Sequence, residues 1–172
     1  HAQAQAQLDA TERQMSAFID STNADAETLL IETININSGS MNLEGVREVG
    51  RILAAQFEAI DFETRWVDGS AFNRAGHLIA EYHGNGNGPK LMLIGHLDTV
   101  FEPDSPFQTF TRLDAEHATG PGISDMKGGN VIILQAMRAL HAANALAPMD
   151  ITIVFTGDEE LSGEPLSLSK QA

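Results

Sequence analysis

The sequence predicts an α/β fold: a mixed, mainly parallel sheet that is covered by helices. Short apolar runs typical of strands alternate with longer amphipathic stretches typical of helices. One of the apolar runs, residues 91–100, leads directly into a histidine and an aspartate. Two later loops, residues 120–129 and 156–163, also carry acidic residues beside expected strand ends or helix starts. In open α/β sheets such strand ends are where ligand sites form.

Three segments have the spacing of amphipathic helices. They cover residues 8–36, 43–60 and 127–144. The polar run at residues 20–23 could divide the first segment into two helices, with Thr22 or Asn23 capping the second. Asn42 is suited to cap the middle segment. The buried side of the last segment is expected to consist of Ile132, Ile133, Ala136, Met137 and Leu140.

Alternating or continuous apolar patterns predict four strands and a short hairpin. The strands are expected at residues 62–67, 77–83, 91–94 and 150–155, and the hairpin at residues 107–118. The strand at 91–94 is expected to be buried. Residues 1–8 are expected to form a disordered tail, and residues 9–172 to form one folded unit.

Composition excludes several classes of protein. The net charge of −14, from 24 acidic and 10 basic residues, argues against a nucleic-acid partner. The absence of cysteine excludes disulfides and cysteine-ligated zinc. No apolar run approaches the roughly 20 residues of a membrane span. The first residues, HAQAQAQ, fit either the remnant of a cleaved signal peptide or an artificial addition. A periplasmic or secreted location is expected, with the cytoplasm as the alternative.

His96 and Asp98 are the first candidates for chemistry. Side chains two residues apart on a strand lie on the same face, so both project from one strand end. A metal-bound histidine usually donates its second ring N–H to a carboxylate, which suits His96 on a metal with Asp98 behind it. The alternative is a hydrogen-bonded polar pair that closes a strand.

Asp125, Glu159 and Glu160 are the acidic candidates. Asp125 precedes an expected helix in a glycine-rich loop, where a carboxylate can bridge two cations. A phosphate loop is disfavoured because Asp125 stands where the third glycine of G-x-G-x-x-G would be. The adjacent Glu159 and Glu160 point apart, so one can hold an ion while the other takes a proton from water. The alternative is a solvent-exposed acidic loop. This cysteine-free ligand set suits zinc or another divalent ion.

Three motifs in this order carry a family resemblance: LMLIGHLDTV, GPGISDMKGG and FTGDEE. They resemble the zinc metallopeptidase family of glutamate carboxypeptidase, aminoacylase and succinyl-diaminopimelate desuccinylase. Residues 74–78 and 104–108 are similar to the glutamate-carboxypeptidase-like branch. The resemblance covers residues 24–172.

The resemblance implies a role for each candidate residue. His96 would ligate one zinc ion, and Asp98 would orient the His96 side chain. Asp125 would bridge two zinc ions, and Glu160 would ligate the second. The peptide bond between Asp125 and Met126 would be cis. Glu159 would be the general base that activates a zinc-bound water for hydrolysis of a C-terminal amide or peptide bond. Co²⁺ or Mn²⁺ could substitute for zinc.

The resemblance also implies that this chain is the N-terminal part of the family's catalytic domain, without its lid or dimerisation domain. Each zinc ion would have two protein ligands here, whereas a stable site normally has at least three. The isolated chain is therefore expected to bind metal weakly, to be inactive unless another chain completes it, and to leave an open sheet edge. A homodimer is expected for the complete protein. Alternatives are an N-acyl amino-acid deacylase and a non-catalytic metal-binding or assembly module.

Overall fold

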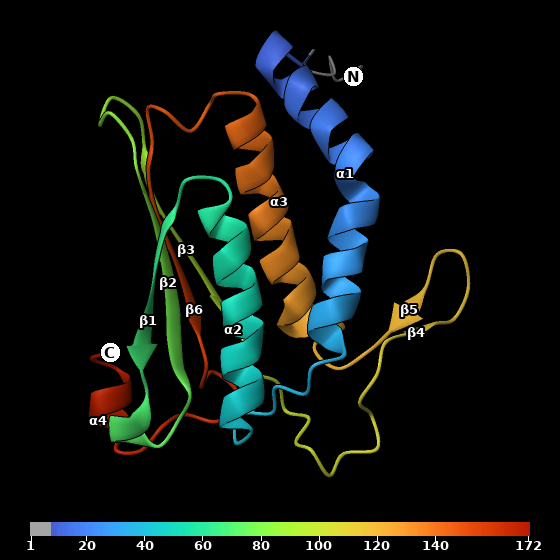
Figure 1. Ribbon diagram of the computed structural model, residues 1–172, viewed down its shortest axis with the longest axis vertical. Helices are drawn as coiled ribbons and strands as arrows, with labels where there is room; N and C mark the ends of the chain where they lie inside the picture. Colours follow the sequence, from blue (N-terminus) through green and yellow to red (C-terminus); the bar gives the residue numbers. More distant parts are fainter. Residues whose placement is uncertain (1–7) are drawn as a thin grey trace, which may run out of the picture.

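A four-stranded sheet organises residues 8–172, which are the part of the chain that this computed structural model describes (Figure 1). The strands stand in the order β1-β2-β6-β3. Their bounds are β1 Glu63–Asp68, β2 Gly76–His83, β3 Lys90–His96 and β6 Asp150–Thr156. A separate hairpin joins β4, Thr111–Arg112, to β5, Ala118–Thr119.

Three long helices lie on one side of this sheet (Figure 1). They are α1 Ala10–Ile34, α2 Leu43–Glu58 and α3 Gly128–Ala142. The short α4, Leu166–Ser169, lies near the chain end beside the turn Ser70–Phe72. Within residues 8–172, no helix is both long and apolar enough to cross a membrane. The expected disordered tail, apart from the exposed Leu8, lies outside the described residues.

The predicted α/β class with a mixed sheet is confirmed. β3 and β6 pair in parallel, whereas β1 with β2 and β2 with β6 are antiparallel. The described strands therefore hold fewer parallel pairs than expected, because β6 lies between β2 and β3 and runs antiparallel to β2. Aromatic packing under the helices forms the centre of the core. The centroid of the Phe57 ring lies 5.4 Å from that of Phe62 and 6.0 Å from that of Phe155.

The first helix is continuous, so the break considered at residues 20–23 does not occur. The hydroxyls of Ser21 and Thr22 both donate to the carbonyl of Phe18 within the helix. Such bonds to the preceding turn let serine and threonine remain inside a helix. Asn42 caps α2 as predicted, accepting from the amide of Gly45.

Two burial predictions were wrong. β3 is an edge strand and not a buried one: Met92 and Ile94 are 63% and 64% exposed. On α3, Ile132 is 71% exposed, because the helix turns Val131 and Leu134 into the core instead. The apolar pattern located both elements correctly but did not reveal which neighbours cover them. Within residues 8–172 the sheet has two edge strands, β1 and β3.

Candidate metal centre

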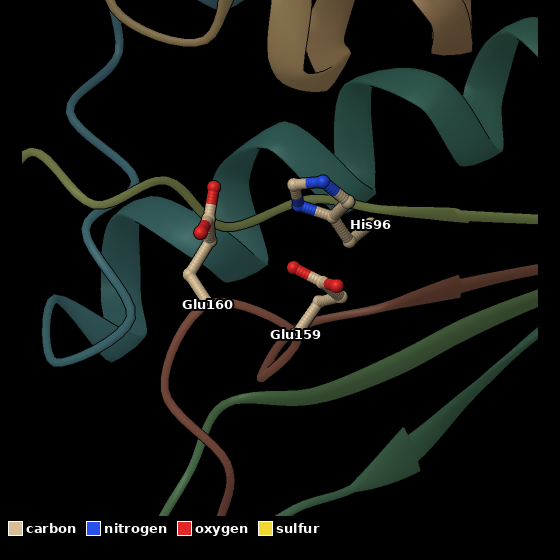
Figure 2. A group of neighbouring side chains, drawn as sticks. All are labelled: His96, Glu159 and Glu160. Atoms are coloured by element: carbon tan, nitrogen blue, oxygen red, sulfur yellow. The ribbon is translucent and has the colours of Figure 1, made fainter.

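The candidate site lies where the parallel strands β3 and β6 end. His96 is the last residue of β3 and pairs with Thr156, the last residue of β6. The loop that follows β6 therefore runs beside His96 and brings Glu159 and Glu160 to it, as Figure 2 shows. Parallel pairing in register is what places two loops from distant parts of the sequence at the same edge of the sheet.

Four of the predicted residues converge at this edge. His96, Glu159 and Glu160 each offer a ligand atom, and these atoms lie within 4.8 Å of one another. Oδ1 of Asp125, from the turn before α3, lies 2.9 Å from Nε2 of His96. The peptide bond after Asp125 is cis, as the family resemblance implies.

Asp98 is fully buried and ties the two loops together. Its Oδ2 accepts from the Ser40 hydroxyl at 2.6 Å and from the Glu160 amide at 3.0 Å. Its Oδ1 accepts from the Glu159 amide at 3.2 Å and lies 3.4 Å from Nδ1 of His96. Burial alone would raise the pKa of Asp98, but hydrogen bonds from His96, Ser40 and these amides hold it below its usual range.

Several carboxylates are crowded around one imidazole in this site, and their negative charge suits a divalent cation. Burial opposes the charged form of His96, yet hydrogen bonds with Asp98 and Asp125 outweigh it and raise the pKa to about 9. Burial, together with the carboxylates of Asp125 and Glu159, raises the pKa of Glu160. One imidazole among crowded carboxylates is a donor set that zinc and related ions bind.

Several supporting residues were not anticipated from the sequence. Ser40 reaches Asp98 from the loop before α2, and Nδ2 of Asn130 on α3 donates to the His96 carbonyl at 2.6 Å. Both side chains are buried. Each lies more than 30 residues from its partner along the chain. A single serine or asparagine has no local sequence pattern that would predict so distant a contact.

His77 is a further supporting residue that was not anticipated. His77 is 4% exposed and stacks on Phe72. Its Nδ1 accepts from the amide of Gly157, at the start of the acidic loop. Asp158 in the same loop is also buried and accepts from the hydroxyl of Ser169 at 2.6 Å. The side of the loop that faces away from Asp98 is therefore fixed as well.

Burial lowers the pKa of His77, so protonation should destabilise the fold. Below the unfolded-state pKa of about 6.5, the unfolded chain binds a proton that the folded chain excludes, and stability falls as the pH falls. We expect His77→Asn to be less stable than the wild type at pH 7.5, with the gap narrowing by up to about 1.4 kcal/mol per pH unit below pH 6.5. Urea unfolding between pH 7.5 and 5.5 measures this. A stability difference between the two proteins that stays constant with pH would contradict this prediction. The control is His83→Asn, because His83 is exposed and lies on the same strand as His77.

Comparison with known proteins agrees with this geometry. Residues 92–170 match the profile of peptidase family M20/M25/M40. This segment belongs to the M20 family. Carboxypeptidase G2 from Pseudomonas sp. (strain RS-16) is 30% identical over 131 residues, which are 76% of this chain and 31% of that protein. Succinyl-diaminopimelate desuccinylase from Leptothrix cholodnii is 30% identical over 116 residues, 63% of this chain and 30% of that protein.

The M20 relationship extends to the fold. Human carnosine dipeptidase 1 superposes with a TM-score of 0.76 at 19% identity, over 87% of this chain and 35% of that chain. The family resemblance expected from the three motifs is thus confirmed. The chain spans about a third of the length of the curated relatives it matches.

Proposed function

We propose that this M20 segment supplies the metal-binding and proton-transfer residues of a di-zinc metallopeptidase that hydrolyses a C-terminal amide or peptide bond, as a glutamate carboxypeptidase does. The observation that carries the proposal is the convergence of His96, Glu159 and Glu160 at the end of two parallel strands. The similarity to carboxypeptidase G2 supports the choice of bond.

The candidate residues have two kinds of role, as metal ligands and as a general base. His96, Asp125 and Glu160 would hold the ions, with Asp125 between them. A divalent ion bound there polarises the substrate carbonyl and makes a water molecule more acidic. Glu159 would take a proton from the attacking water and deliver it to the leaving amine. Asp98 keeps His96 and the backbone of the acidic loop in place through the contacts described above.

A deacylase is the second candidate. The desuccinylase relative supports it, because removal of an acyl group from an amine breaks the same kind of amide bond. The assignment of residues 9–172 to the N-terminal part of a catalytic domain, export and homodimerisation remain predictions.

Zinc content and a substrate panel test the proposal. We expect bound zinc in protein purified without chelators, in a smaller amount per chain for residues 1–172 alone than for the complete polypeptide. The complete polypeptide should release glutamate from a peptide that ends in glutamate, and should hydrolyse the matching N-acetyl amino acid more slowly. A chelator should abolish both activities. Faster hydrolysis of the N-acetyl compound would favour the deacylase. Full zinc occupancy with no turnover on either would support a non-catalytic metal-binding module.

A further inference from the structure

Lys127 is a buried cation whose role the proposed reaction does not explain. Its side chain is among the largest fully buried ones, with 2% of the residue exposed. The ammonium donates to the carbonyl oxygens of Thr33 at 2.8 Å and Ile36 at 2.9 Å. Burial lowers the pKa of Lys127 to about 8. A charge placed where it is poorly solvated needs a structural reason.

The two acceptors lie at the C-terminal end of α1. Carbonyl groups at a helix C-terminus lack partners in the helix and carry partial negative charge, which cations stabilise. The last turn of α1 has no basic residue of its own. Lys127 supplies this cation from a position 94 residues further along the chain than Thr33.

The same residue closes the turn that carries Asp125. The amide of Lys127 donates to the Gly122 carbonyl at 2.8 Å, so the turn is bounded by these two residues. Within it, Asp125 has the non-helical angles φ −134° and ψ 96°. The Asp125 side chain is 77% exposed, and its carboxylate contacts Nε2 of His96. Because so little packs around this side chain, its position depends on the backbone that Lys127 anchors.

We propose that Lys127 is a positioning residue for Asp125: by fastening the turn to the end of α1, it sets the carboxylate opposite His96 in the geometry that a cation requires. This inference rests on the proposed metal site. It predicts that loss of Lys127 weakens metal binding through Asp125, and not only through a less stable fold.

Co²⁺ titration of the complete polypeptide, followed by visible absorption, tests this in the wild type and in Lys127→Met. We expect the variant to bind Co²⁺ about 10-fold to 100-fold more weakly, the range typical for residues that orient metal ligands. Lys127→Arg, which keeps the charge and the donors, should recover part of the loss. Circular dichroism and urea unfolding report whether each variant folds, and Lys127→Gln replaces Lys127→Met if the latter does not.

Gln135→Leu is the matched control. Gln135 is also nearly buried, lies on α3 and fastens it to α1, through a hydrogen bond from Nε2 to the Thr22 hydroxyl at 3.1 Å. The control should lower the free energy of unfolding and leave Co²⁺ affinity within about twofold of the wild type. An equal loss of affinity in Gln135→Leu and Lys127→Met would show that the effect is general instability, and would overturn the inference.

A double-mutant cycle with Asp125→Asn then shows whether Lys127 acts on the metal through Asp125. If Lys127 acts through Asp125, adding Lys127→Met to Asp125→Asn should change Co²⁺ affinity by less than about twofold. Independent, additive losses would overturn the role of Lys127 while leaving the metal site intact. A wild-type protein without Co²⁺ absorption would overturn the metal site itself, and with it this inference.

Discussion

Replacement of Glu159 by glutamine is expected to lower kcat by a factor of about 10²–10⁴, the usual contribution of a general base. The amide cannot accept a proton from water at neutral pH, but it has nearly the same shape as the carboxylate. The backbone amide of residue 159 would still donate to Asp98, so the loop should keep its position. The measurement is kcat of the complete polypeptide on the substrate that it hydrolyses fastest, together with zinc content by elemental analysis.

Zinc content decides how this result is interpreted. Lost turnover with unchanged zinc supports Glu159 as the base. Retained turnover with unchanged zinc would rule that role out, and lost zinc would make Glu159 a ligand, which its place beside His96 and Glu160 also allows. Glu164→Gln is the control: Glu164 is exposed and lies four residues beyond Glu160, so its replacement should leave kcat unchanged.

Replacement of Gly76 by alanine is expected to lower the free energy of unfolding by about 3–5 kcal/mol, from backbone strain and overpacking together. Gly76 begins β2 with φ +113°, a conformation that residues with a Cβ rarely adopt. An added Cβ would lie 2.0 Å from the carbonyl oxygen of Val67, on the neighbouring strand. Neither backbone can move without disturbing the pairing of Gly76 with Asp68.

Gly86→Ala separates the two contributions. Gly86 also has a positive φ, +74°, but no atom lies within 4 Å of an added Cβ. Only strain applies there, and the expected cost is about 1 kcal/mol. Urea unfolding of both variants gives the comparison. Equal losses would show that the clash with Val67 is relieved at little cost.

Local sequence pattern was sufficient to locate most of the fold and the residues of the candidate site. The i and i+2 spacing of His96 and Asp98 placed both at one strand end, and adjacent Glu159 and Glu160 followed the next strand. These predictions depended on residues close together in the sequence, or on motifs whose order is characteristic of a family. The structure brings them together because β3 and β6 are paired in register.

Contacts between distant segments could not be predicted in the same way. The bond from Lys127 to Thr33 spans 94 residues, and that from Ser40 to Asp98 spans 58. Neither lysine nor serine is unusual enough in its local sequence to indicate burial. The exposure of Met92 and Ile94 was missed for a related reason, since an apolar run indicates a strand but not whether another strand covers its edge.

The strand order β1-β2-β6-β3 has a consequence for how the molecule assembles. β3 pairs with β6 alone in the described sheet, and β6 follows it by more than 50 residues. During synthesis β3 therefore remains unpaired until residues 150–156 have emerged. The next residues to appear include Glu159 and Glu160, whose amides bind Asp98 beyond the end of β3. Closure of the sheet and assembly of the site thus become one late, non-local event, and contacts of long sequence separation form slowly.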